Sequence, residues 1–257
     1  MSLFHRREHD SAKGYATAGE LGHTTNGTPL GEILHVKIDE DPLQWLMIPV
    51  GWGDRFYYSG PAAFGQKMAP VYWGVWKEQN PGVSDPDPVA VDRTRAELQY
   101  YAEKFGGFDP MRLFETVTFL YIPTPTVSAM PVRCWVDDGP GLTADMVALV
   151  VDPDAVQPPT VEKFHTPALG DGIKATRHCL YDAEPGQDPD QRGLWVSVRY
   201  AFKVPDRQAV VTVVATHNDL GRMAAAQPDL DAFVNTITLV YAGGEPFTQT
   251  PRTRWLA

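Results

Sequence analysis

The chain has 257 residues, of which 43% are hydrophobic and 21% are charged, and its formal net charge is −10 at pH 7. These fractions are typical of a folded globular protein and exclude a mostly disordered chain. The negative charge disfavours non-specific binding to nucleic acid or to anionic membrane surfaces. No apolar run reaches the roughly 18 residues that a membrane span needs, so we expect no membrane insertion.

The N-terminal sequence does not resemble a signal peptide, because charged and small residues follow Arg6 and Arg7 where an apolar segment is required. The two cysteines are too few for a disulfide framework. We therefore expect a cytoplasmic protein with reduced thiols. Residues 1–30 lack hydrophobic periodicity, which predicts a flexible arm. We expect a single domain over 31–242 and a C-terminal tail over 243–257.

The first half of the chain predicts three short strands and one helix. Strands are expected in EILHVKI (32–38), in LQWLMIPVGW (43–52), where Pro49 ends the strand or places it at an edge, and around 70–77. The helix is expected over 89–105, with Asp87 as its N-cap, Pro88 at the first helical position and two glycines behind it. Its apolar stripe consists of Val91, Leu98, Tyr101 and Phe105.

The second half predicts mostly strands. Strand-like runs occupy 113–123 and 130–138, and residues 144–152 suit either a helix or a strand. Residues 160–216 predict an antiparallel meander, with one hairpin turn at Gly170–Gly172 and another at 205–207.

The chain ends with an amphipathic helix that is expected to start near Pro228 and to bury Leu230, Phe233, Val234 and Ile237. A last strand follows in TITLVYA, 236–242. Together the elements predict an α+β fold, an antiparallel β-sheet with flanking helices.

Three features resemble the Mog1/PsbP-like family, which includes the LpqN-type proteins of actinobacteria. They are the Pro-x-Gly-Trp sequence at 49–52, the late meander of long strands, and the strand, helix and short strand at the end. The resemblance covers about residues 30–242 and implies a Mog1/PsbP-like sandwich that binds proteins, in an actinobacterial system. The chain departs from these relatives by its insertions between 53 and 130 and by lacking a lipobox cysteine, so a role at the cell envelope is not expected.

His217 and Asp219 form the clearest polar cluster, at the junction between a strand and a helix. One interpretation makes His217 a general base that Asp219 orients, with Arg199 or His178 nearby, as in a hydrolase or a small-molecule-binding protein. The favoured interpretation makes Asn218 or Asp219 the N-cap of the helix beginning LGRMAAA.

Other patterns that suggest ligand sites are weaker. The sequence GDGIK at 170–174 resembles a phosphate loop, but a strand rather than a helix follows it. A zinc site would need His165, His178, Cys134 and Cys179, which lack the usual spacing, and symmetric pairing about the glycines puts the two histidines on opposite faces. The carboxylates at 84–92 and 136–138 do not match a calcium loop. We therefore expect neither a metal nor another cofactor.

Eight large aromatic residues lie within residues 45–76. They form either a Trp-rich core or a partly exposed contact surface, since Tyr and Trp are common at binding hot spots. The expected protein-binding residues are Trp52, Tyr57, Tyr58, Tyr72, Trp73 and Trp76. The sequence thus favours a non-catalytic protein-binding or assembly module that binds a partner protein or another copy of itself. The alternatives are the His217 site and a structural role in a phage-like or secretion assembly.

Overall fold

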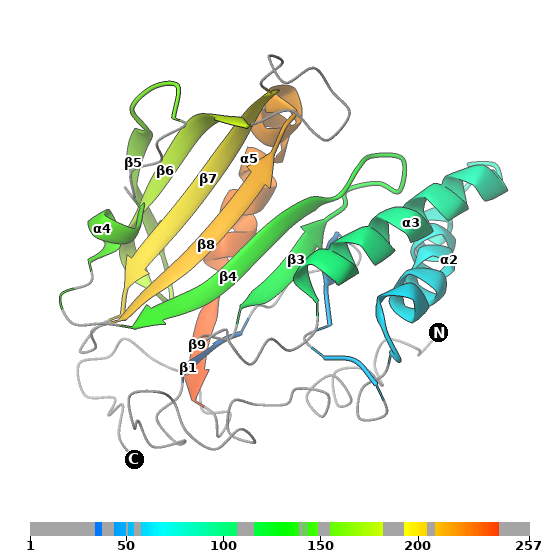
Figure 1. Ribbon diagram of the computed structural model, residues 1–257, viewed down its shortest axis with the longest axis horizontal. Helices are drawn as coiled ribbons and strands as arrows, with labels where there is room; N and C mark the ends of the chain where they lie inside the picture. The colour runs from blue at the N-terminus through cyan, green and yellow to red at the C-terminus, as the bar shows by residue number, and fades with distance from the viewer. Residues whose placement is uncertain are drawn as a thin grey trace. The chain divides into compact units, whose positions relative to one another are not determined.

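A computed structural model of the chain describes residues 34–37, 44–49, 51–53, 58–106, 116–138, 141, 143–148, 155–181, 193–204 and 209–241 (Figure 1). The chain divides into two compact units. Unit 1 contains Asp41–Leu113 and Val117–Ala129, and unit 2 contains Gly31–Glu40, Phe114–Thr116 and Met130–Ala257. The predicted arm, the predicted tail and Tyr57 lie outside the described residues.

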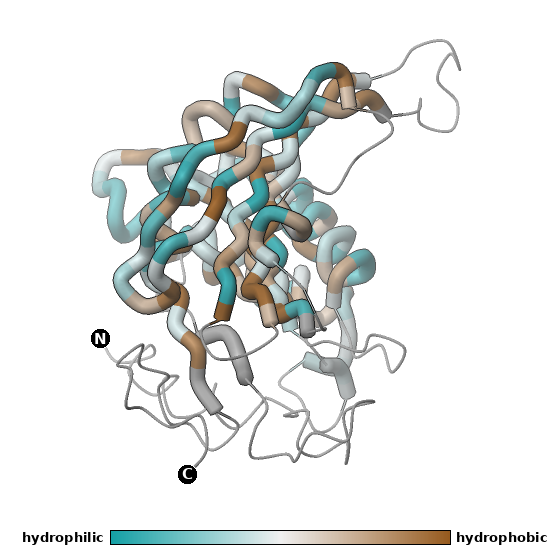
Figure 2. Tube along the Cα trace, turned by 90° about the vertical axis from the view of Figure 1, so that its left-hand side faces the viewer, coloured by the Kyte–Doolittle hydropathy of each residue, from teal (hydrophilic) through white to brown (hydrophobic). Residues whose placement is uncertain are grey.

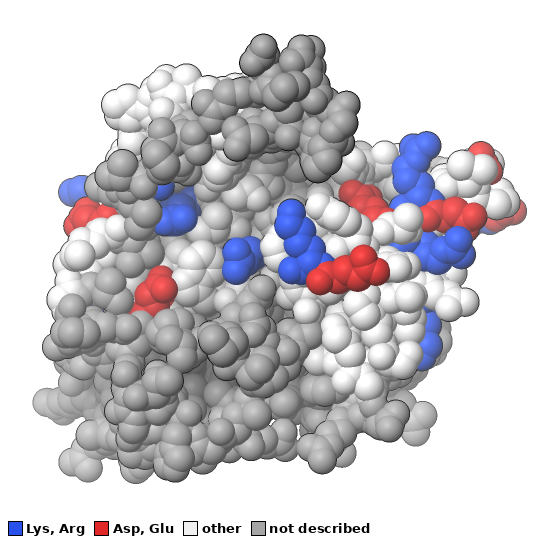
Figure 3. Space-filling model, in the orientation of Figure 1, with Lys and Arg blue, Asp and Glu red and all other residues white. Residues whose placement is uncertain are grey.

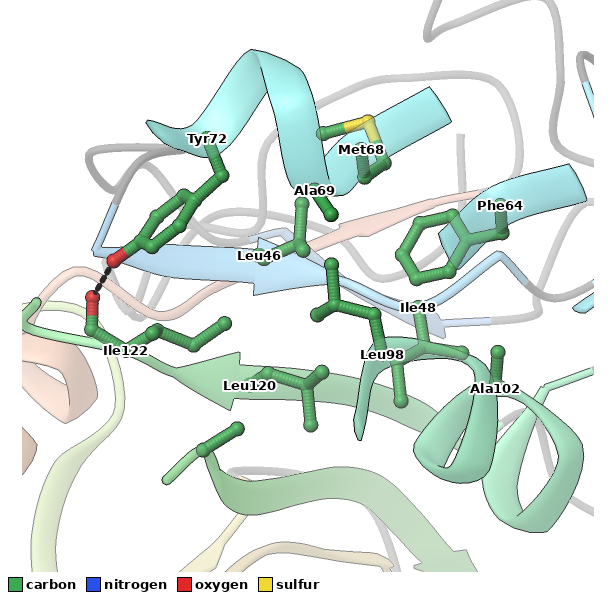
Figure 4. Packing of buried hydrophobic residues seen from close by; sticks show 11 residues of the cluster. Leu46, Ile48, Phe64, Met68, Ala69, Tyr72, Leu98, Ala102, Leu120 and Ile122 are labelled. Atoms are coloured by element: carbon green, nitrogen blue, oxygen red, sulfur yellow. Dashed lines mark hydrogen bonds between the residues drawn. The ribbon is translucent and has the colours of Figure 1, made fainter. Parts of the chain in front are cut away.

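The described residues of unit 1 form two strands and two helices. Strand β2 (Trp45–Met47) pairs antiparallel with β3 (Val117–Tyr121), so that Leu46 lies opposite Leu120. Helices α2 (Pro61–Gln79) and α3 (Pro88–Phe105) supply much of its hydrophobic core (Figure 4). The buried core residues are Leu46, Ile48, Phe64, Met68, Ala69, Tyr72, Leu98, Ala102, Leu120, Ile122 and Ala129.

Helix α3 begins and ends where the sequence predicts. The Asp87 side chain accepts a hydrogen bond from the backbone N–H of Val89 at 3.0 Å, and Pro88 occupies the first turn. Gly106 follows the last helical residue. This helix confirms the prediction because its start and stop signals are local and need no tertiary contact.

The strand predicted around 70–77 is wrong, because these residues belong to helix α2. The buried residues Phe64, Met68 and Tyr72 recur every four positions, and Gly65, Ala69 and Trp73 form a second buried row beside them. Pro70 falls on the exposed side of the helix. The helical spacing of the apolar residues is recognisable only when residues 61–69 are considered together with 70–77. Gly65 permits a close approach to α3, since an added Cβ would lie 2.7 Å from the carbonyl oxygen of Arg95.

Unit 2 contains a five-stranded antiparallel sheet in the order β4-β8-β7-β6-β5. Its strands are β4 (Met130–Asp138), β5 (Thr160–Thr166), β6 (Gly170–Tyr181), β7 (Gly193–Lys203) and β8 (Ala209–His217). A separate antiparallel pair joins β1 (Leu34–Lys37) to β9 (Thr238–Tyr241). The predicted meander over 160–216 and the α+β class are confirmed, while the Mog1/PsbP-like sandwich stays a prediction.

The hairpin turn predicted at Gly170–Gly172 is wrong by a few residues. Thr166 pairs with Gly170 and His165 pairs with Asp171, so the turn lies at 167–169 and Gly170, with a φ of 75°, begins β6. Gly172 lies within the strand opposite Phe202, and a Cβ there would come within 2.4 Å of the Phe202 ring. The glycine therefore makes room for a ring and does not form the turn.

Helices α4 (Ala144–Ala148) and α5 (Leu220–Asn235) cover opposite faces of this sheet (Figure 1). We call these the α4 face and the α5 face. Hydrophilic and hydrophobic residues alternate along the strands in Figure 2, as expected when successive side chains point to opposite faces. The buried residues of the α5 face include Val132, Cys134, Val196, Val198, Tyr200, Phe202, Val211, Val213 and Ala215.

Helix α5 starts earlier than the predicted position near Pro228 and follows directly after Asp219, as the N-cap interpretation predicts. It begins at Leu220, and Pro228 lies inside it on the exposed side. The helix continues through this proline because residues on both sides of it are buried, namely Met223, Ala226, Leu230, Phe233 and Val234. Of the helices in the described part of the chain, none is long and apolar enough to cross a lipid bilayer.

Candidate functional site

The His217 cluster lies at the end of β8, where the chain enters α5. Asp219 is the N-cap, and its carboxylate accepts a hydrogen bond from the backbone N–H of Arg222 at 3.0 Å. The backbone N–H of Asp219 donates to Nδ1 of His217 at 2.9 Å. The cap interpretation of this cluster is therefore confirmed, with Asp219 and not Asn218 in the cap position.

The same geometry restricts what the His217 ring can do as a base. Partial burial lowers the pKa of His217, and the charge of Arg222 lowers it further, against the opposing influence of Asp219. A neutral ring whose Nδ1 accepts a hydrogen bond carries its proton on Nε2. Neither ring nitrogen then offers a lone pair to a substrate proton in this arrangement.

The residues proposed for a zinc site are not brought together. The register places His165 on the α4 face and His178 on the α5 face, and Cys134 and Cys179 also lie on opposite faces. Both cysteines are buried and free, and burial raises the pKa of the Cys134 thiol. Within the described ranges, no three His, Cys, Asp or Glu side chains are grouped as metal ligands.

The aromatic region of residues 45–76 is mainly part of the core of unit 1. Tyr72 is 4% exposed and donates a hydrogen bond to the carbonyl of Ile122, which Figure 4 shows as a dashed line. Trp73 is 6% exposed, and its indole N–H donates to Oγ1 of Thr94 at 3.0 Å. Trp52 and Tyr58 pack against the core cluster and are half-buried, as is Trp76. Tyr72 and Trp73 therefore present no exposed ring for a partner.

The α4 face carries a group of arginines that the sequence analysis did not bring together. Arg133 on β4 and Arg199 on β7 each lie opposite Val214 of β8, which separates them. Arg177 on β6 lies opposite Ser197, two residues from Arg199 along β7. All three side chains therefore point to one face, and Figure 3 shows Lys and Arg side chains over the middle of the sheet on this face.

Polar contacts order the β4 end of the α4 face. The guanidinium carbon of Arg133 lies 5.5 Å from the ring centroid of Trp135, within the range of a cation–π contact. The Trp135 indole N–H donates to Oδ2 of Asp137 at 2.9 Å, and Thr212 donates to the same oxygen at 2.8 Å. Two donors on one carboxylate oxygen fix the Trp135 ring, which remains half-buried.

The α5 face contains one polar cluster beneath its helix. Asp231 of α5 accepts hydrogen bonds from Lys174 at 3.0 Å and from the Tyr200 hydroxyl at 2.6 Å. Gln227, one turn earlier, donates to the Tyr200 oxygen at 3.0 Å. Burial raises the pKa of Tyr200, and the hydrogen bond and charge of Asp231 raise it further. These bonds connect α5 to two strands and satisfy each group, which indicates a structural cluster.

Alternation along the strands is the signal that could have found the arginine group. Each arginine stands inside a strand-like run, in VRCW, ATRHC and SVRYAF. An arginine amid β-branched and aromatic residues indicates a sheet face that is not purely apolar. The pairing register was still needed to place the three residues on one face.

The chain matches no protein-family model and no curated protein.

Proposed function

We propose that this chain is a non-catalytic protein-binding or assembly module that contacts its partner through the α4 face of unit 2. The observation that carries the proposal is the ordered Arg133–Trp135 pair, fixed by Asp137 and Thr212 on a sheet face. Trp and Arg are the side chains most enriched at binding hot spots, and a fixed ring loses little entropy on binding.

Burial patterns support the choice of this face over the aromatic region. Tyr72 and Trp73 are core residues, whereas Trp135, Arg133 and Arg199 are half-buried and extend from regular strands. A half-buried side chain on a strand has both a fixed base and an accessible end. The resemblance to the Mog1/PsbP-like family, whose members generally bind proteins, points to the same class of function.

Site-specific crosslinking tests the proposal. A photoreactive residue in place of Val214, between Arg133 and Arg199, is expected to crosslink a partner protein or a second copy of the chain. The matched control places it at Ala224, an exposed position on α5. Equal crosslinking at both positions, or none at Val214, would contradict the proposal.

Two substitutions then test the hot spot with the captured partner. Trp135→Ala and Arg133→Ala are each expected to weaken binding by about 30-fold, the effect of losing a hot-spot side chain. Trp76→Ala, in unit 1, is the control and is expected to leave binding unchanged. Light scattering separates a homo-oligomer from a complex with another protein. Binding that is insensitive to Trp135→Ala would place the contact elsewhere.

A further inference from the structure

Arg177 carries a buried charge that forms no ion pair with a carboxylate among the residues that the structure describes. Among the buried residues that the structure describes, Lys174 and Arg177 are the only two with a charged side chain, and each is 6% exposed. Lys174 has Asp231 as its counter-charge. Arg177 donates from Nη2 to the backbone carbonyl of Ala148, and its Nε has no hydrogen-bond partner in the described structure. A buried charge without a counter-charge destabilises the folded state, so an anion at this position would stabilise the fold.

The neighbours of Arg177 on the α4 face are hydrogen-bond donors. Ser197 lies directly opposite on β7 and is itself buried, and Thr216 lies opposite Ser197 on β8. Arg199 is the diagonal neighbour of Arg177. Side chains directly opposite each other have Cβ atoms about 5 Å apart, and diagonal neighbours are about 7–8 Å apart. Two guanidinium groups and two hydroxyl groups can therefore reach one small ligand group.

The chemistry of these donors selects an oxyanion. A guanidinium group has five N–H donors and no acceptor, and its planar fork matches the oxygens of a carboxylate or a phosphate. Asp137, on the same face, already accepts bonds from Trp135 and Thr212. The net charge of −10 repels long polyanions, which favours a small ligand over nucleic acid.

We infer that Arg177, Arg199 and Ser197 form a binding site for a compact oxyanion, the carboxylate or phosphate group of a small ligand. Anion binding at this site does not require a protein partner at the neighbouring Arg133–Trp135 pair. An experiment that excludes the anion site therefore leaves the proposed function untouched, and the reverse is also true.

Thermal unfolding of the full chain tests the site with inorganic phosphate and with succinate as probes. At constant ionic strength, at least one of them is expected to raise Tm saturably, by roughly 3–6 °C at a tenfold excess over Kd. Sodium chloride is the ionic-strength control. A response to phosphate alone assigns a phosphate group, and a response to succinate alone assigns a carboxylate. No response to either probe, or an equal response to chloride, would overturn the site.

Three variants locate the binding within the fold. Arg199→Gln is expected to weaken probe binding at least tenfold by calorimetry, and Lys163→Gln, an exposed cation on the same face, to leave it unchanged. Arg177→Met removes the buried charge, so the anion-free variant is expected to unfold at the same or a higher Tm than the parent and to lose the response to the probe. A full response in both Arg177→Met and Arg199→Gln would show that the anion binds elsewhere.

Discussion

Lys174 on β6 and Asp231 on α5 form an ion pair with an Nζ–Oδ1 distance of 3.0 Å, although 57 residues separate them in the sequence. Lys174 also lies directly opposite Tyr200, whose hydroxyl donates to the same carboxylate. The pair thus joins the last helix to the middle of the meander, and it compensates a lysine side chain that is only 7% exposed.

Removal of Lys174 is expected to destabilise the protein more than the removal of a lysine from a surface ion pair would. In Lys174→Met, the carboxylate of Asp231 keeps its hydrogen bonds from Tyr200 and Gln227 but loses its positive counter-charge. We expect a loss of about 2–4 kcal/mol, somewhat below the value for a fully buried pair, because the Asp231 side chain is 32% exposed. Urea unfolding measures this loss in the free energy of unfolding. A double-mutant cycle with Asp231→Leu is expected to show coupling, and additive effects would argue against the pair.

Asp219 is expected to stabilise α5 as its N-cap. Asp219→Ala removes the acceptor for the Arg222 N–H and should cost about 1 kcal/mol, measured by urea unfolding. Asn218→Ala is the matched control, because Asn218 is exposed and precedes the cap. A larger loss of stability for Asn218→Ala than for Asp219→Ala would reverse the assignment of the N-cap.

His217→Ala should leave the partner crosslink at position 214 unchanged.

His217 is expected to make the stability depend on pH in the weakly acidic range. Its pKa in the folded protein is below the ordinary value of 6.5, so the unfolded chain binds the proton more readily. Stability should therefore fall as the pH drops through about 6.5, and level off once the folded form is also protonated. Urea midpoints between pH 7.5 and 5 measure the slope, which His217→Asn should reduce. An unchanged slope in this variant would exclude His217 as its source.

Trp73 is expected to act as a core residue and not as a contact residue. Trp73→Ala leaves a cavity between α2 and α3 and deprives Thr94 of its indole donor, at a cost of about 3–5 kcal/mol. Trp76→Ala should cost less, because Trp76 is half-buried and meets Trp73 only edge to face, at 5.7 Å between ring centroids. Thermal unfolding compares the two. Equal stability losses would show that Trp73 is less enclosed than its burial indicates.

The sequence by itself determined the features that depend on neighbouring residues. Asp87 and Pro88 define the start of α3 because capping uses backbone groups within one turn. Alternating β-branched residues determined the strands of the meander and the α+β class. The same local reading failed at 70–77, where an aromatic run around Pro70 was interpreted without the preceding turns of α2.

Only the tertiary structure decided which of these residues meet. The pairing register places Arg133, Arg177 and Arg199 on one face of the sheet, although they come from three different strands. It also placed Gly172 under Phe202 and moved the hairpin turn to 167–169. A shift of one residue in any strand would turn its side chains to the other face, and the register depends on which side chains the fold buries. The site is therefore a product of strand pairing, and no short motif in the sequence encodes it.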